Sequence, residues 1–378
     1  MPKGRPKGSK NSKAKVAVGT VSGAVMSSAM LVSAPEEQIV ETISLDKERA
    51  RALDIAIGHV EAEYGKGILY TEENMEVLKN RPVYSTGFPS LDHIISAKGG
   101  IPSGRVIEAY GHKSSGKSTF ALHLSAEMNR IGLPVLYVDL ENTLDLELAK
   151  RMGVQVGTNL FIVSTPAYGE QALDVLNKFA RSKACGLIVL DSVSALCPKE
   201  EDEKGVEKVT MGSVARMMSK ELRILTGIVS RPENNTLVLF INQIRKNLAA
   251  WGAPNTTSGG EALPFFASVR LEFRQTEILK ASSDGEPYGI EVNIKTVKNK
   301  IHNPYKECRL NLHFGKGFDL VADLMKVAVD LGIMEKGGAW YQYGDQKLQG
   351  EDKMRAWLTE EATRLPALKQ QIHQVVRG

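Results

Sequence analysis

The chain has 378 residues, which exceeds one average domain, so its length indicates a large core with one or two small appendages. Hydrophobic residues make up 42% and charged residues 24%, as in ordinary globular proteins, which excludes collagen-like, coiled-coil and wholly disordered chains. Three widely spaced cysteines without a CxxC pair argue against a disulfide framework or a zinc site. We therefore expect a protein of a reducing compartment.

The net charge of +4 arises at the N-terminus. Residues 1–15 carry six lysines and arginines and no acid, so the rest of the chain has a net charge of −2. We expect a basic, disordered tail over 1–38. Its segment 3–10 resembles a minor-groove AT-hook, and a plain electrostatic arm or a targeting segment are the alternatives.

Residues 39–80 predict an amphipathic helix followed by a short strand. Apolar side chains recur at helical spacing before Gly65: Leu53, Ile57, Val60 and Tyr64. A single helix with the apolar run 68–70 cannot bury its own face, so we expect it to dock on its own core or on a neighbouring chain. We interpret 39–80 as an oligomerisation arm.

Short β-rich runs alternate with helical stretches over 81–325. The expected strands are 106–110, 134–140, 160–164, 186–191, 236–242, 267–274 and 290–299. Near-continuous apolar strands separated by helices predict an α/β core with a mainly parallel central sheet covered on both faces, extended by antiparallel late strands. Residues 326–378 predict a small α+β C-terminal domain.

Residues 111–118 fit the pattern GxxxxGK[ST] between an expected strand and an expected helix, which is the context that a phosphate-binding loop requires. Its backbone N–H groups form a nest for phosphate oxygens, Lys117 can neutralise phosphate charge, and the Ser118 hydroxyl can bind Mg²⁺. We expect ATP and Mg²⁺ here. The predicted nucleotide contacts are Gly111, Ser114, Ser115, Gly116, Lys117, Ser118 and Thr119.

Three further strands end in polar residues, where parallel sheets gather their ligands. Asp191 either holds hydrated Mg²⁺ or caps the next loop. Glu141 either orients and deprotonates the attacking water or is a surface acid. The Gln243 amide either senses the γ-phosphate or satisfies loop backbone.

Together, these motifs closely resemble the bacterial RecA recombinase family from about Asp46 to the end. The matching stretches are YGKG, GHKSSGKST, VDLENTLD, GLIVLDSVSAL, MGSVARMMSKELR, FINQIR, TTSGGEAL, FFASVRLEFR, VKNKI and GAWYQY. Hexameric helicases share the nucleotide motifs, whereas MGSVARMMS, NQIR and FFASVR follow the recombinase pattern.

The resemblance implies a RecA-type P-loop ATPase core. It further implies an ATP-dependent homologous recombinase that forms a helical filament on single-stranded DNA and pairs it with double-stranded DNA, in the cytoplasm of a bacterial or phage-infected cell. Two rival functions are a RecA-fold hexameric helicase and a nucleoprotein scaffold that activates a partner protein.

The resemblance also implies roles for individual residues of the ATP site. Glu141 becomes the water-activating base, Ser118 and Asp191 the metal ligands, and Gln243 the amide that couples the γ-phosphate to DNA binding. The polar contact to the adenine base is assigned to Asp145.

Lys298 and Lys300 in VKNK are implied to reach the neighbouring protomer's ATP. Positive charge supplied in trans would make hydrolysis conditional on assembly. Read alone, VKNK is a solvated strand end.

Two long polar segments, 199–209 and 244–258, follow strand ends, and the family uses them as DNA-binding loops. The implied contacts to single-stranded DNA are Met211, Arg216, Ser219, Arg223, Arg245, Trp251, Gly259 and Gly260. Arg216 and Arg223 lie on a helix that must also pack, so structural ion pairs are an alternative for both.

Three positions depart from the family pattern. Glu261 stands where Asn usually lies beside DNA phosphates, and a carboxylate there would repel them unless it is paired. Leu148 and Val321 replace tyrosines that usually stack on adenine, which weakens the expected ATP site.

Overall fold

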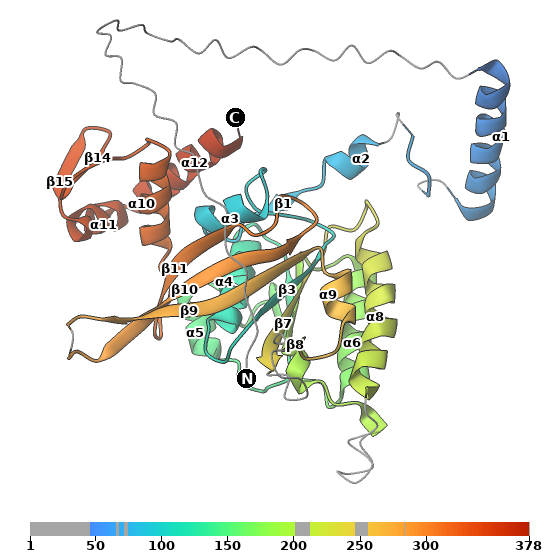
Figure 1. The fold of residues 1–378 in the computed structure, drawn as a ribbon, viewed down its shortest axis with the longest axis horizontal. Coiled ribbons are helices and arrows are strands. Elements are labelled where there is room, and N and C mark those ends of the chain that lie inside the picture. The colour runs from blue at the N-terminus through green and yellow to red at the C-terminus, as the bar shows by residue number, and fades with distance from the viewer. Residues whose placement is uncertain are drawn as a thin grey trace, which may run out of the picture. The chain divides into compact units, whose positions relative to one another are not determined.

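A computed structural model describes residues 46–65, 68–71, 75–200, 212–245, 256–282 and 284–377 (Figure 1). The chain divides into two compact units, Met1–Leu69 and Tyr70–Gly378. The basic tail expected over 1–38 lies outside the described residues.

The described part of the first unit is dominated by helix α1 (Lys47–Tyr64). It begins at Asp46, whose carboxylate accepts hydrogen bonds from the backbone N–H groups of Glu48 and Arg49 at 2.8 and 3.3 Å. It ends at Gly65, where φ is +89°. None of the α1 side chains is buried, and Leu53 is 49% exposed. As the sequence predicts, the helix does not bury its own apolar stripe.

A ten-stranded sheet forms the centre of the second unit, in the order β12-β11-β10-β9-β3-β7-β6-β4-β5, with β8 paired to β7. Its strands are β3 (Val106–Gly111), β4 (Val135–Asp139), β5 (Phe161–Ser164), β6 (Leu187–Asp191), β7 (Leu237–Arg245), β8 (Thr256–Thr257), β9 (Val269–Lys280), β10 (Pro287–Asn299), β11 (Glu307–His313) and β12 (Gly317–Phe318). In this order, the neighbouring strands from β9 through β3, β7, β6 and β4 to β5 are parallel. The neighbouring strands from β9 through β10 and β11 to β12 are antiparallel. The predicted parallel core with an antiparallel extension is confirmed.

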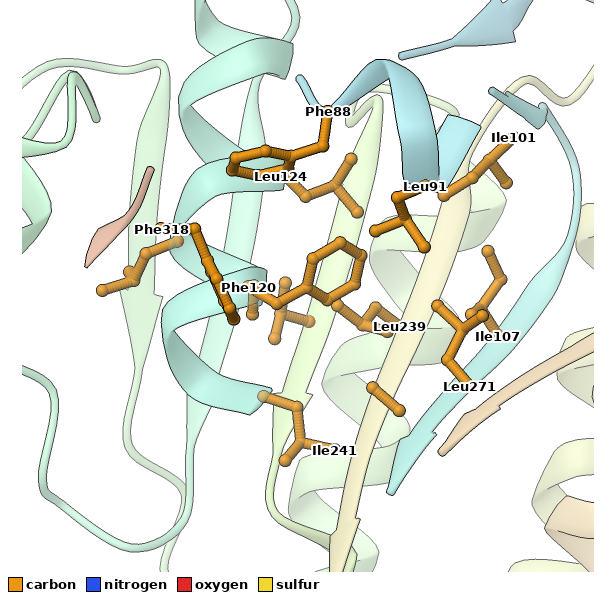
Figure 2. Packing of buried hydrophobic residues seen from close by; sticks show 14 of the residues in the cluster. Phe88, Leu91, Ile101, Ile107, Phe120, Leu124, Leu239, Ile241, Leu271 and Phe318 are labelled. Atoms are coloured by element: carbon orange, nitrogen blue, oxygen red, sulfur yellow. The ribbon is translucent and has the colours of Figure 1, made fainter. Parts of the chain in front are cut away.

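Helices cover both faces of this sheet. They are α3 (Pro89–Ile95), α4 (Lys117–Arg130), α5 (Leu146–Arg151), α6 (Gly169–Ser182), the 3₁₀ turn η1 (Val193–Ala195), α8 (Ser213–Val229) and α9 (Ala262–Phe266). Alternate strand residues face opposite sides: Ile107 and Leu239 pack with Phe120 of α4, whereas Leu190 and Phe240 pack with α6 and α8. Figure 2 shows the first of these clusters, with Phe120 and Leu124 of α4 packed towards Leu239 and Leu271.

The chain enters this core through α2 (Glu76–Lys79) and the small antiparallel pair β1 (Val83–Tyr84) and β2 (Ile101–Pro102). Among the helices that the structure describes, none has the length and apolar character needed to cross a membrane.

The C-terminal segment forms its own hydrophobic cluster next to the antiparallel edge of the sheet (Figure 1). It contains α10 (Leu320–Asp330), β13 (Glu335–Gly337), β14 (Trp340–Tyr343), β15 (Gln346–Gln349), α11 (Glu351–Glu360) and α12 (Arg364–Arg377). The three strands form an antiparallel sheet. Helix α10 is continuous across residues 325 and 326, where the sequence places a domain boundary. Lys369 of α12 pairs with Glu127 of α4 at 3.1 Å and ties this segment to the core.

Candidate ATP and DNA sites

The loop between β3 and α4 requires glycine at two positions. A Cβ on Gly111 would lie 2.2 Å from the backbone oxygen of Phe273. Gly116 has a φ of +88°, and a Cβ there would lie 2.8 Å from Cζ of Phe318. The loop can therefore keep its course only with glycines at both places. The other predicted contacts lie on the same loop or on the first turn of α4: Ser114, Ser115, Lys117, Ser118 and Thr119.

Lys117 lies at the start of α4 and is turned into the loop. Its Nζ donates hydrogen bonds to the His112 carbonyl at 2.6 Å and to Ser115 Oγ at 3.3 Å. Burial lowers the pKa of Lys117 to about 8, and the charges of Asp191 and Glu141 oppose this shift. The Lys117 amine is thus held inside the loop by two oxygen acceptors.

Asp191 and Ser118, the two predicted metal ligands, contact each other. The Asp191 carboxylate accepts a hydrogen bond from Tyr137 Oη at 2.7 Å and is also hydrogen-bonded by the Ser118 side chain. Burial raises the pKa of Asp191, while these two hydrogen bonds lower it. A carboxylate and a hydroxyl side by side form an oxygen donor set that fits Mg²⁺. The sequence analysis did not single out Tyr137, because it is one of several residues in an apolar run.

Glu141 lies where three neighbouring strands end. Its Oε1 accepts hydrogen bonds from Gln243 Nε2 at 2.9 Å and from Ser192 Oγ at 2.7 Å. Asp139, at the end of β4, accepts from the backbone N–H groups of Glu141 and Leu144 and shapes the turn that carries the carboxylate. The structure therefore brings Glu141 and Gln243 together, as the strand-end argument predicts. It adds Ser192, whose only sequence signal is its place directly after Asp191.

Gln243 is connected to the end of the second predicted DNA-binding segment, residue 258, through Asn242, which the sequence analysis did not single out. The buried Asn242 amide donates to the carbonyl of Ser258 and to Glu108 Oε1, both at 2.9 Å. Glu108 is fully buried and its Oε2 accepts from Arg270 Nε at 2.5 Å. A hydrogen-bonded path thus runs from Glu141 to residue 258.

Asp145 caps a helix. Its carboxylate accepts the backbone N–H of Leu148 at 2.8 Å at the start of α5. Leu148 packs against the cluster that contains α4, and Val321 packs against the C-terminal cluster. The cap gives Asp145 a structural duty beside its predicted contact to adenine.

Lys298 does not behave as a solvated strand end. Its Nζ donates to the carbonyl oxygens of Pro264 and Phe265, both at 2.7 Å, and so caps the C-terminal turn of α9. Burial lowers the pKa of Lys298, and Lys300 and Arg270 add to this shift. Lys300, at the end of β10, has an exposed side chain.

The predicted DNA contacts on α8 share one face of the helix. Arg216, Ser219 and Arg223 are spaced by about one turn and are all exposed. Within the described ranges neither arginine forms an ion pair, so the alternative that both serve as structural ion pairs finds no support there. Three of the predicted contacts lie outside the part of the chain that the structure describes: Met211, Trp251 and the side chain of Arg245.

Gly259 and Gly260 approach the beginning of α8 and the turn after β6. Their φ angles are +86° and +75°, and a Cβ would lie 2.8 Å from Val193 Cγ1 and 2.9 Å from Ala215 Cβ, respectively. Close packing alone thus requires glycine at both positions. Glu261 follows them with an exposed side chain, and the described residues supply no ion-pair partner for it.

Known proteins are similar in sequence to this chain over most of its length. A family profile described as RecA N-terminal domain matches residues 51–319, and one described as RecA C-terminal domain matches residues 322–377. The Protein RecA of Ruminococcus albus is 42% identical over 323 residues, covering 85% of this chain and 79% of that protein. The Protein RecA of Geobacter sulfurreducens is 41% identical, covering 84% and 92%, and that of Aquifex aeolicus is 41% identical, covering 87% and 93%.

Among solved structures, a crystal structure of the RadB recombinase aligns with a TM-score of 0.47 and 22% identity, covering 62% of this chain and 98% of that one. The profile matches and the relatives of about 40% identity cover both the core and the C-terminal segment. The chain belongs to the RecA family.

Proposed function

We propose that Glu141 is the base that activates water for ATP hydrolysis, and that Gln243 reads the state of that site. Membership of the RecA family makes the chain a DNA-dependent ATPase and an ATP-dependent recombinase that exchanges DNA strands. The helicase and scaffold alternatives are not favoured. The observation that carries the assignment is the shared contact of Gln243 and Ser192 with one oxygen of Glu141.

Some residues of the site bind ATP in the ground state, and others contribute mainly in the transition state. Lys117 and the backbone N–H groups of 111–119 bind phosphate, which is needed before any chemistry. Ser118 and Asp191 would hold Mg²⁺, which supplies charge neutralisation on the phosphates when bound. Glu141 then orients water and takes its proton, a contribution made mainly in the transition state.

Gln243 gives this site a means of control over DNA. Its amide donates to Glu141, and its backbone N–H donates to Asn242 Oδ1 at 2.9 Å. A γ-phosphate that draws the amide away from Glu141 would move β7, whose last two residues open the segment 244–258. We propose that ATP affinity and single-stranded DNA affinity are coupled along this strand.

We propose that single-stranded DNA lies along Arg216, Ser219 and Arg223 of α8 and along Gly259 and Gly260. Exposed arginines and glycine backbone N–H groups suit backbone phosphates. The remaining predicted contacts are Met211, Arg245 and Trp251. The filament would assemble through the apolar stripe of α1, take double-stranded DNA as second substrate, and act in the cytoplasm of a bacterial or phage-infected cell.

Two variants test the division of roles. Lys117→Ala should abolish ATP binding, because Lys117 contacts phosphate in the ground state. Glu141→Gln should keep ATP and DNA binding and lower the turnover rate by about a hundredfold or more, as expected for loss of a general base. The measurements are nucleotide binding and DNA-stimulated ATPase rates.

Glu147→Gln is the matched control, since Glu147 is an exposed acid on α5 that pairs with Lys150 at 2.9 Å. Its turnover should equal that of the unchanged protein. Equal loss of nucleotide affinity in the Lys117 and Glu141 variants would refute the proposed roles.

A further inference from the structure

His123 connects the helix that follows the phosphate loop with the strand that leads to the C-terminal domain. It lies on α4, and its ring is 5.0 Å from the ring of Phe88 and 5.9 Å from that of Phe318, measured between centroids. Its Nε2 accepts the backbone N–H of Phe318, in β12, at 2.8 Å. A residue of the ATP-binding helix thus holds a segment almost two hundred residues later in the chain.

This hydrogen bond fixes the protonation of the ring. An imidazole accepts at Nε2 only when it is neutral and carries its proton on Nδ1. Burial lowers the pKa of His123 to about 4, and the charge of Glu127 opposes that shift. The ring is therefore an acceptor throughout the neutral pH range.

The strand held by His123 lies against the phosphate loop. The ring of Phe318 is close enough to Gly116 that a Cβ on Gly116 would be 2.8 Å from Cζ. Gly317 has a φ of +96°, and a Cβ there would be 2.7 Å from His123 Nε2, so glycine permits the close approach. Figure 2 shows Phe318 packed on α4 next to Phe120.

The residue that directly follows this strand is anchored by the C-terminal domain. Asp319 caps α10 by accepting the N–H of Ala322 at 3.1 Å. Its two carboxylate oxygens also accept from the two terminal nitrogens of Arg355, on α11. The chain is therefore held by α4 at Phe318 and by α11 at Asp319, and the Phe318 ring reaches Gly116.

We infer that His123 is a positioning residue for ATP. By accepting the Phe318 N–H, it keeps the Phe318 ring against Gly116 and so keeps the backbone donors of the phosphate loop in place. Removal of the acceptor leaves a buried N–H unpaired, and β12 moves away to reach water. The inference rests on the assignment of 111–119 as the nucleotide site.

The test compares His123→Leu, which removes the acceptor, with His123→Gln, whose side-chain oxygen can replace it. With single-stranded DNA present, His123→Leu should raise KM for ATP about five- to tenfold, in line with loss of one buried hydrogen bond. The kcat should stay within about twofold, because Glu141 is untouched. His123→Gln should recover most of the loss in KM.

Ser125→Ala is the matched control on the same helix, because Ser125 Oγ donates only to the Ala121 carbonyl of α4 at 2.7 Å. It should leave KM unchanged. Phe318→Leu, which replaces the ring facing Gly116 with a smaller side chain, should also raise KM. This variant tests the inference if His123→Leu does not fold.

An unchanged KM in a folded His123→Leu variant, or a Gln variant as impaired as the Leu variant, overturns the inference. If the His123→Leu variant does not fold, an unchanged KM in Phe318→Leu overturns the inference. A Lys117→Ala variant that binds ATP as tightly as the wild type would instead contradict the assignment of 111–119 as the nucleotide site.

Discussion

At the residue scale, the ATP site depends on groups that orient the chemically active ones. Ser192 is 1% exposed, and its hydroxyl lies 2.7 Å from Glu141 Oε1 and 2.6 Å from Ser194 Oγ. With Gln243 it donates to a single carboxylate oxygen, which fixes the plane of the Glu141 carboxylate. A base whose orientation is fixed needs less reorganisation when water is deprotonated.

Ser192→Ala should therefore reduce kcat for ATP hydrolysis about tenfold, since the Gln243 contact remains while one hydrogen bond to a charged group is lost. The KM for ATP should change little, because Ser192 does not lie on the phosphate loop. Steady-state kinetics with single-stranded DNA measure both. Ser182→Ala, which removes an exposed hydroxyl bonded to the Phe179 carbonyl, is the control. A change confined to KM would contradict an orienting role.

At the element scale, the sequence predicts strands better than it predicts their partners. The core strands β4 and β6 are buried on both faces, so they appear as continuous apolar runs that are easily recognised. Glu141, Asp191 and Gln243 follow such runs, and their meeting at one edge of a parallel sheet could be predicted.

Contacts between elements far apart in the chain could not be predicted in the same way. The hydrogen bonds from Tyr137 to Asp191 and from Lys298 to α9 depend on strand order and side-chain rotamers, which no local pattern encodes. The same holds for His123 and Phe318. Asp145 shows the opposite case. Its helix-capping position is local and could have been predicted, but the sequence analysis considered only its contact to adenine.

We expect burial of Asp323, where α10 contacts α3, to make the stability of the C-terminal domain depend on pH. Asp323 is 3% exposed and its carboxylate accepts the backbone N–H of Ser90 at 3.2 Å. Burial raises the pKa of Asp323 to about 6, the neighbouring charge of Asp92 adds to the shift, and hydrogen bonds from Ser90 oppose it. A pKa raised by folding contributes stability at low pH, and that contribution is lost as the pH rises through about 6.

Asp323→Asn should remove this dependence while keeping an oxygen for the Ser90 N–H. The free energy of unfolding of the wild type, relative to that of the variant, should fall by about 1.4 kcal/mol between pH 5 and pH 7.5. Urea unfolding at pH 5, 6 and 7.5 measures the difference, with Asp330→Asn at the exposed end of the same helix as control. Parallel pH curves for wild type and Asp323→Asn would show that Asp323 stays ionised in the folded protein.

At the scale of the whole molecule, the two lysines at the end of β10 differ in what their side chains contact. The transition state spreads negative charge over the γ-phosphate oxygens, and the phosphate loop contributes Lys117. Lys298 is engaged by the carbonyls of its own α9, whereas the side chain of Lys300 is exposed beside it. Substitution of Lys300 therefore tests more directly than substitution of Lys298 whether a lysine supplies positive charge to the ATP site of a neighbouring protomer.

Lys300→Ala should bind ATP normally as an isolated protomer and fail to hydrolyse it in the filament, because its neighbour's site lacks a cation. Glu141→Gln fails for the complementary reason. An equal mixture of the two should regain about a quarter of wild-type turnover, since random assembly places an intact Glu141 beside an intact Lys300 at that fraction of head-to-tail contacts. The ATPase rate is measured against the mixing ratio. Glu141→Gln mixed with Lys117→Ala is the control and should stay inactive at every ratio, because neither chain then carries a working ATP site. If both lysines serve the site of their own chain, every mixing ratio stays inactive, because no single chain then carries a complete site.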